Sequence, residues 1–456
     1  MASRIKIKKG LDIPLLGEVQ ETFLGEVKSD VLKICPEDFA GVTPKLSVRV
    51  GDEVKAGAAL MYDRNHPSVK VASPISGVVT AIDRGEKRRI LNITVERKGE
   101  NEFVDFGIKN ALTMKPEEVK EYILDAGLWF LVKQRPYDVV ANPEKEPRDI
   151  FVTGFSSAPL APSYDFILKD QDKDVQAGLD ALSKLTKGKV YLSISPKTTS
   201  KALRNAKNVV VTEFDGPHPA GNVGVQINHL KPINSGETVW TLNVLDVALI
   251  GRLFNTGKVD LTRIVALTGS EVEKRGYYKM LIGTPLTEVL APIAKSADIN
   301  LRYICGDPLT GRKIEKDGVL RAYDSQITVI PEGDDKHELL GWATLSPNKY
   351  SAGPTYLSSL LHKIGVKDKF RIDARIKGGP RAMIMSNEYD QVFPMDIYPE
   401  FLLKSIIAFD IDKMINLGIF EVAPEDFALC EFVDTSKIEI QRIVRTGLDM
   451  LRKEVE

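Results

Sequence analysis

The sequence is poor in the residues that hold metal ions, iron–sulfur clusters and disulfides. Its 456 residues include five histidines and three widely separated cysteines, Cys35, Cys305 and Cys430. The cysteines form neither a CxxC pair nor a disulfide framework, which fits a reducing compartment. The histidines never recur at the spacing of helical metal ligands. The sequence therefore predicts neither a metal site nor a cluster on this chain.

Long hydrophobic runs are also missing. FLLKSIIAF (401–409) is among the most lipophilic stretches, and it is far shorter than the roughly 20 residues of a membrane-spanning helix. MASRIKIKKGLDIPLLG (1–17) has basic residues but no apolar core of a signal peptide. Any action at a membrane is therefore expected to need docking onto a partner. The net charge of −1 provides no field that would recruit nucleic acid.

Glycine motifs that cradle phosphates are absent as well. Dinucleotide binding needs G-x-G-x-x-G between a strand and its helix. The corresponding segment, VTGFSSAPLAPSYDFIL (152–168), has one glycine and two prolines, and no Walker A lysine motif occurs in the chain. The sequence predicts that this chain binds neither NAD nor FMN.

What is present begins with a strand-rich, glycine-punctuated segment over residues 1–105. VRVGDEVKAGAALM (48–61) and NHPSVKVASPISGVVTAIDRG (65–85) have the strand and turn order of a barrel-sandwich hybrid, the shape of biotinyl and lipoyl carrier domains. In biotinyl domains the attachment lysine lies eight residues before a proline, and that position is His66 here. Lys70 lies within a strand. We expect a barrel without a swinging arm, used for docking.

Short apolar strands then alternate with amphipathic helices over residues 106–257. IFVTG (150–154), VYLSI (190–194) and NVVVTEF (208–214) are predicted strands, and DKDVQAGLDALSKLTKG (172–188) is a predicted helix. Apolar strands without alternation, joined by helices, favour a parallel sheet covered on both faces. This pattern predicts a Rossmann-like domain.

Two more segments complete the predicted organisation. Residues 258–335 hold strands around one helix, PLTEVLAPIA (285–294), which indicates a β-grasp domain. Residues 336–456 form a C-terminal region that ends in helices, one of them beginning at Pro399 and ending at Gly418. The predicted fold class is α/β multidomain: a barrel-sandwich hybrid, a Rossmann-like parallel domain, a β-grasp domain and a C-terminal helical domain.

The candidate site is the loop FDGPHPAGNVGVQINHL (214–230), which holds two of the five histidines. It follows the carboxyl end of a predicted strand, where open α/β sheets place their ligands. One interpretation is a loop that contacts a small ligand or a partner through His218, Gly221 and Gly224. The alternative is an ordered connection whose glycines satisfy turn geometry. No Ser-His-Asp or paired-carboxylate constellation is evident, so no catalytic residue is assigned.

Taken in order, several segments resemble the A subunits of the sodium-translocating NADH:quinone reductases over nearly the whole chain. The segments that carry the resemblance are IKIKKGLDIPLLG (5–17), HPSVKVASPISGVV (66–79), GPHPAGNVG (216–224), CGDPLTG (305–311), QITVIPEG (326–333) and the tail 394–454. The resemblance implies a fold related to the flavin- and NADH-binding subunit of respiratory complex I and to the Rnf complex C subunit. It also implies that the third domain is a soluble-ligand-binding β-grasp (SLBB-like) domain. The tail would be ferredoxin-like without its cluster, because Cys430 and Asp434 stand where relatives have several cysteines.

The same resemblance implies a function. The chain would be a peripheral subunit on the cytoplasmic side of the bacterial inner membrane, in a six-subunit complex that oxidises NADH, reduces ubiquinone and exports sodium. NADH, FAD, FMN and iron–sulfur centres would be carried by partner subunits, and ubiquinone is a possible ligand of this one. The isolated chain would be inactive. The alternatives are an FMN- and NADH-binding electron-transfer subunit and a structural adaptor with no quinone contact.

Overall fold

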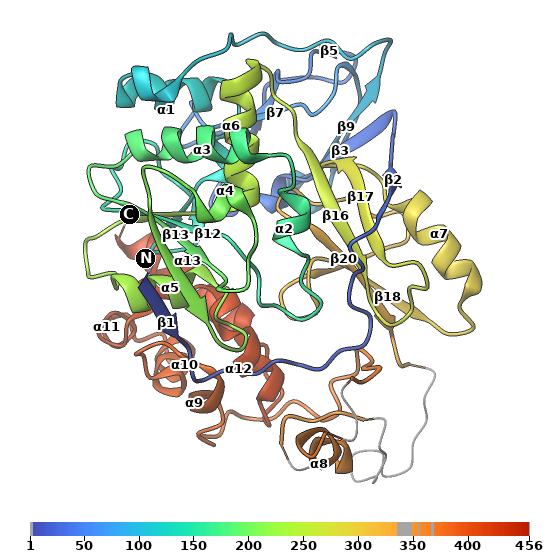
Figure 1. The fold of residues 1–456 in the computed structure, drawn as a ribbon, viewed down its shortest axis with the longest axis vertical. Helices are drawn as coiled ribbons and strands as arrows, with labels where there is room; N and C mark the ends of the chain where they lie inside the picture. The colour runs from blue at the N-terminus through green and yellow to red at the C-terminus, as the bar shows by residue number, and fades with distance from the viewer. Residues whose placement is uncertain (1–2, 335–348, 354–355, 366–368, 456) are drawn as a thin grey trace.

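Four β-sheets and a helical C-terminal part make up the fold of the residues that the structure describes (Figure 1). The computed structural model describes residues 3–334, 349–353, 356–365 and 369–455. The sheets have seven, six, four and three strands. Within the described residues, no helix is long and apolar enough to cross a membrane.

The two small sheets form the barrel-sandwich domain expected from the sequence. One has the order β3 (Val31–Ile34), β9 (Ile90–Arg97), β8 (Gly77–Arg84) and β5 (Glu53–Val54). The other contains β4 (Pro44–Leu46), β6 (Ala59–Asp63) and β7 (Lys70–Ala72). Their buried side chains belong to the same apolar core as the neighbouring α/β part. The barrel is therefore packed firmly onto the rest of the chain.

The first 26 residues lie outside the barrel. β1 (Ser3–Lys6) adds a parallel edge strand to the seven-stranded sheet, Leu15 bridges to Phe370, and β2 (Phe23–Glu26) pairs with β17 (Gly276–Leu281). From the sequence these residues were expected within the barrel, because a short strand does not reveal which sheet it will join. This N-terminal segment ties three parts of the molecule together.

The seven-stranded sheet has the order β1-β14-β13-β12-β15-β10-β11. β1, β14 (Val210–Asp215), β13 (Val190–Ile194), β12 (Ile150–Thr153) and β15 (Val239–Asn243) run parallel. β10 (Lys133–Arg135) and β11 (Val139–Val140) form an antiparallel edge. α1 (Pro116–Asp125), α2 (Tyr164–Ile167), α3 (Asp172–Lys184), α4 (Lys201–Arg204), α5 (Val223–Leu230) and α6 (Val244–Thr256) accompany this sheet. The predicted parallel strands are confirmed, whereas β10, β11 and β15 had not been predicted.

The helices α3 and α6 pack closely because neither carries a side chain at the crossing. A β-carbon on Gly178 or Gly251 would collide with the backbone of the opposite helix. α6 ends at Gly257, whose φ of +69° is the left-handed conformation that glycine commonly adopts at the end of a helix. This pair supports the strands that lead to the candidate site.

The six-stranded sheet has the order β19-β18-β20-β16-β17-β2. It contains β16 (Thr262–Thr268), β18 (Leu301–Cys305), β19 (Arg312–Ile314) and β20 (Gln326–Pro331), with α7 (Thr287–Ser296) beside it. The helix α7 and the strands β16, β18 and β20 agree with the sequence, which predicted neither β17 nor β19.

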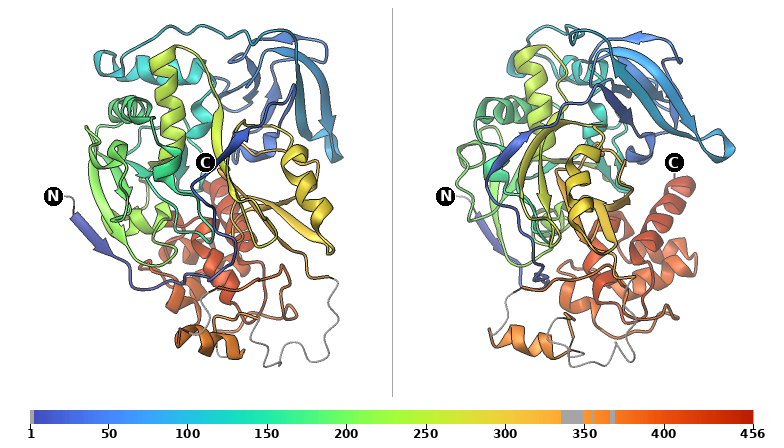
Figure 2. Two further views of the ribbon diagram at one scale, coloured as in Figure 1. Left: turned by 45° about the vertical axis from the view of Figure 1, so that its right-hand side comes forward. Right: turned by 90° about the vertical axis from the view of Figure 1, so that its right-hand side faces the viewer.

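The C-terminal part packs below the two large sheets (Figure 2). Its helices are α8 (Leu357–Lys363), α9 (Tyr389–Val392), α10 (Pro399–Ile407), α11 (Ile411–Asn416), α12 (Ala428–Val433) and α13 (Ile440–Val455). The single helix expected from Pro399 to Gly418 is in fact α10 and α11, separated by Phe409 in a left-handed conformation. α13 buries one apolar face, formed by Ile440, Val444, Leu448 and Leu451 at helical spacing.

Candidate functional site

The candidate site lies where three parallel strands end at one edge of the seven-stranded sheet. β1, β12 and β14 run in the same direction, so their following loops, 7–12, 154–160 and 216–222, meet there. The Gly221 amide donates to Ser157 Oγ at 2.8 Å, and the Leu11 amide donates to the His218 carbonyl at 2.8 Å. The predicted meeting place at the carboxyl ends of the strands is thus occupied by the chain's own loops.

His218 is held from two sides. Its backbone N–H donates to Asp12 Oδ1 at 2.8 Å, and its Nδ1 lies 3.0 Å from Ser157 Oγ. The Ser157 hydroxyl already accepts from Gly221, so its own proton can go to Nδ1, which leaves the imidazole proton on Nε2. Nε2 is buried and has no hydrogen-bond partner among the described residues. It is a polar group that a ligand oxygen could satisfy.

Burial keeps this imidazole neutral. The His218 side chain is 3% exposed, and this burial lowers its pKa below the usual 6.5, against the opposing influence of the Asp307 and Asp12 carboxylates. Asp307 belongs to the CGDPLTG segment, which brings the loop after β18 toward the site. Two motifs that are far apart in the sequence therefore lie in one neighbourhood.

Gly221 and Gly224 lie where neighbouring atoms come too close for a side chain. A β-carbon on Gly221 would lie 2.5 Å from the Ser157 amide nitrogen. The sequence predicted Gly224 in the loop, and this prediction is wrong. The residue lies in the first turn of α5, because the helix begins at Val223. A β-carbon there would meet the Asp426 carboxylate and Arg135 Nη1. His229 is also in α5, where its Nδ1 lies 2.9 Å from the Val225 carbonyl oxygen.

A buried ionic cluster adjoins the first turn of α5. Arg135 Nη1 donates to Asp426 Oδ2 at 2.7 Å and to the Glu421 carbonyl at 2.7 Å, and Nη2 lies 3.1 Å from Glu425 Oε1. Neither the Arg135 nor the Asp426 side chain is exposed. The cluster joins β10 to the C-terminal part. Sequence reasoning missed it, since no spacing links residue 135 to residue 426.

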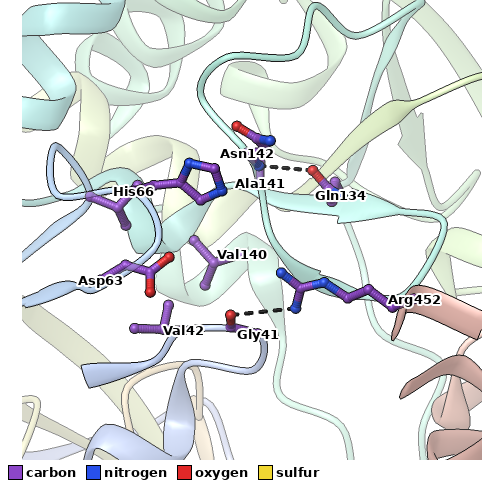
Figure 3. A pocket seen from close by; sticks show the side chains of 10 residues that line it. Gly41, Val42, Asp63, His66, Gln134, Val140, Ala141, Asn142 and Arg452 are labelled. Carbon is purple, nitrogen blue, oxygen red and sulfur yellow. Dashed lines mark hydrogen bonds between the residues drawn. The ribbon is translucent and has the colours of Figure 1, made fainter. Parts of the chain in front are cut away.

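The turn that carries the cofactor lysine in biotinyl domains is here partly buried at His66, while Asn65, Pro67 and Ser68 are exposed. His66 lines a small pocket with Asp63, Gln134, Asn142 and Arg452 (Figure 3). The pocket holds about 20 Å³, room for a water molecule and no more. Nearby, Lys70 Nζ lies 3.0 Å from Asp125 Oδ1. The turn packs against the chain's own seven-stranded sheet, at the edge formed by β10 and β11.

A larger cavity of about 310 Å³ lies where the barrel meets the six-stranded sheet. Its lining mixes the charged residues Glu26, Lys28, Asp30 and Arg97 with Met280 and other neighbours. Arg97 Nε lies 3.3 Å from Asp30 Oδ1, so part of the charge is already paired. No motif in the sequence pointed to this cavity.

Cys430 and Asp434 lie in a closed, hydrogen-bonded core. Asp434 Oδ1 accepts from Tyr389 Oη at 2.9 Å and from the Ser436 amide at 3.0 Å, and Oδ2 accepts from the Ile438 amide at 2.9 Å. Burial raises the pKa of the Cys430 thiol well above its usual value. Among the described residues, no three His, Cys, Asp or Glu side chains are grouped closely enough to hold a metal ion.

Three family models match successive parts of the chain. They are the NqrA N-terminal barrel-sandwich hybrid domain over residues 5–98, the NqrA second alpha/beta domain over 114–259 and the NQRA C-terminal domain over 264–316. The A subunit of the Na(+)-translocating NADH-quinone reductase of Neisseria meningitidis serogroup B is 36% identical over 454 residues, which are 99% of this chain and 100% of the relative. The chain belongs to the NqrA family, the A subunits of these reductases.

Other members of the NqrA family agree over the same span. The A subunit from Hahella chejuensis is 35% identical over 453 residues, again 99% of this chain and 100% of the relative. Two solved structures of NAD+-reducing [NiFe]-hydrogenase give TM-scores of 0.32 and 0.34, at 14% and 11% identity. They cover 50% and 68% of this chain and 48% and 55% of theirs. Neither likeness is close enough to define the fold or the function of this chain.

Proposed function

We propose that this chain is the peripheral A subunit of a sodium-translocating NADH:ubiquinone reductase and contributes to the quinone-reducing step coupled to sodium export. The observation that carries the proposal is the likeness to named A subunits from end to end, over 99% of this chain and 100% of the relative. A shared domain alone would not match both chains in full. The chain would act as part of the complex and be inactive alone.

The finer architecture belongs to this proposal. We assign residues 1–105 to the barrel-sandwich hybrid, with β1 and β2 reaching out of it, and residues 106–257 to a Rossmann-like domain. Residues 258–335 are assigned to a β-grasp domain of the soluble-ligand-binding (SLBB-like) type, and 336–456 to a region that ends in a ferredoxin-like helical domain without a cluster. The five parallel strands and the engaged carboxylate of Asp434 support these assignments.

The proposed quinone contact is the loop that holds His218 and Gly221, with Gly224 at the start of the following helix. A quinone carbonyl oxygen is an acceptor, and in the tautomer in which Ser157 donates to Nδ1, the buried Nε2 of His218 is a donor without a partner among the described residues. No covalent chemistry is assigned to these residues. Their part would be to bind and orient the quinone.

The proposed setting is the cytoplasmic side of the bacterial inner membrane, in an assembly of six subunits. NADH, FAD, FMN and iron–sulfur centres would be held by the partner subunits. The segment 152–168 supports this division, because its loop packs against the His218 loop through Ser157 and offers no glycine-rich cradle for a pyrophosphate.

Affinity purification tests the proposal. The tagged chain is produced in a bacterium that has the other subunits of the reductase but lacks its own A subunit. It should be recovered from mildly solubilised membranes together with flavin-bearing subunits. The eluate should show sodium-stimulated NADH:ubiquinone reduction. Recovery of the chain alone, without activity, would reject the proposed function.

A second candidate function is a structural adaptor that makes no quinone contact. The observation in its favour is that His218 is nearly inaccessible and fastened to Asp12 and Ser157. Photo-crosslinking of the purified complex with an azido-quinone separates the two. Labelled peptides from 154–160 or 216–224 support quinone contact, and labelling confined to other subunits supports the adaptor.

A further inference from the structure

Helix α10 is apolar on both of its faces. Its inner face, Leu402, Leu403 and Ile406, is buried against the C-terminal helices, and Gly447 of α13 lets Ile406 approach closely. A β-carbon on Gly447 would lie within 3.0 Å of three Ile406 carbons. Burial of the inner face is therefore enough to explain why α10 folds and packs here. It does not explain why the outer face is apolar as well.

The outer face exposes large apolar side chains where polar ones are usual. Tyr398 is 69% exposed, Phe401 52%, Ile407 47% and Phe409 65%, and only Lys404 interrupts them with a charge. The rings of Tyr398 and Phe401 contact edge to face, with centroids 6.2 Å apart. These four side chains, here called the α10 patch, are exposed on or directly beside one helix, and large apolar side chains exposed together in this way mark an interaction site.

Phe409 adds an independent observation. It follows the last turn of α10 with φ +57°, where glycine would avoid the steric strain that a side chain brings. Its amide donates to the Ile406 carbonyl and the Asp410 amide donates to the Ser405 carbonyl, both at 3.0 Å, so the chain must turn there. An aromatic ring at a strained and exposed position does not stabilise the fold. It is explained if a partner uses the ring.

We infer that the α10 patch docks another polypeptide, a segment of the complex's membrane subunits whose apolar side chains are flanked by lysine or arginine. The charges around the patch favour this occupant. Asp396 and Asp412 are exposed, and neither has an ion-pair partner among the described residues, while Asp410 is paired with Lys413 at 2.6 Å. An apolar centre with a polar, partly acidic rim is the anatomy of a protein interface.

Other occupants fit these charges less well. An anionic lipid surface attracts clustered lysine and arginine, whereas the α10 patch holds the single lysine Lys404 and its rim carries the unpaired carboxylates of Asp396 and Asp412. A second copy of the chain would bring the same carboxylates together around a two-fold axis. Cytoplasmic ends of membrane-spanning helices carry an excess of lysine and arginine beside apolar residues, which complements both the centre and the rim. The identity of this partner rests on the proposed function.

The test compares the wild-type chain with a Phe401→Ser/Phe409→Asn variant. Asparagine adopts the left-handed conformation readily, so the variant should keep or raise the melting temperature. It should nevertheless lose at least tenfold in recovery of the membrane subunits from solubilised membranes, since buried aromatic side chains dominate interface energies. Ile108→Ser is the matched control, because Ile108 is 74% exposed and lies far from α10 in sequence; its recovery should equal that of the wild type.

Three results would overturn the inference. One is full recovery of the membrane subunits by the double variant. Another is flotation of the purified wild-type chain with vesicles of phosphatidylglycerol and phosphatidylethanolamine that the variant loses. The third is a dimer in sedimentation that the variant abolishes. Failure of the wild-type chain itself to recover the subunits would instead reject the proposed function.

Discussion

Arg135 and Asp426 form a buried ion pair, 2.7 Å between Nη1 and Oδ2, that connects strand β10 to the C-terminal part of the chain. The two residues are 291 positions apart. Because both side chains are inaccessible, removing one partner leaves the other charge buried without compensation. The pair therefore controls how firmly the C-terminal helices hold to the seven-stranded sheet.

Breaking this pair should destabilise the protein strongly. We expect Arg135→Ala to lower the free energy of unfolding by about 3–5 kcal/mol, measured by urea denaturation. The double variant Arg135→Met/Asp426→Leu removes both charges and should lose less than Arg135→Ala alone. Equal losses in the two proteins would mean that the charges do not act as a pair.

His218 should make stability depend on pH. Its folded-state pKa lies below 6.5, so the unfolded chain binds a proton more readily as the pH falls through 6.5. Stability should decline below that pH, by about 1.4 kcal/mol for each unit of pKa difference, until the folded-state pKa is reached. His218→Asn should flatten the difference in unfolding free energy between pH 7.5 and pH 5.5. An unchanged pH profile would contradict the assignment.

Gly224 should tolerate no side chain. In a helix, Gly→Ala normally adds up to about 1 kcal/mol of stability. Here the added methyl group would overlap Asp426 and Arg135, so we expect Gly224→Ala to destabilise by about 1–3 kcal/mol. Gly379→Ala is the control, since a β-carbon at that position meets nothing within 4 Å. Its melting temperature should not move.

The three thiols should be unreactive in the folded protein. Cys35, Cys305 and Cys430 are buried, and burial raises the pKa of Cys35 to about 11 and those of the other two well above their usual value. Thiolates are the reactive form, so Ellman's reagent at pH 8 should react slowly. All three should react at once in guanidinium chloride. Rapid native labelling of any one would show that its surroundings open.

Local patterns in the sequence were enough to predict the strands and helices whose own apolar spacing is regular. The apolar strands around 150, 190 and 210 and the helix that begins at Asp172 were predicted because each buries its own apolar face. β15 was missed since VWTLN runs directly into α6 at Asn243. Gly224 was misplaced because its helix is short and follows a Gly- and Pro-rich loop.

Only part of the candidate site could be predicted, because local sequence patterns do not reveal contacts between distant segments. The sequence located His218 and Gly221 at the end of a strand, and the structure places them there. Three further residues reach the site from other segments: Asp12, Ser157 and Asp307. The residues beside each of them in the sequence do not predict this position. Long-range partners of this kind follow from the packing of whole sheets, which local sequence does not encode.

The N-terminal segment has a consequence for how the chain is made. Ser3 pairs with Thr212, and Phe23 pairs with Tyr277, so the first strands to be synthesised must wait for partners that emerge some 200 residues later. Until then their backbone groups have no native partner, and closing loops of that length slows folding. The seven-stranded sheet can close once β15 has been synthesised, and the six-stranded sheet only after β20. In both sheets, the edge strand made by the beginning of the chain can be added only after the middle of the chain has been synthesised.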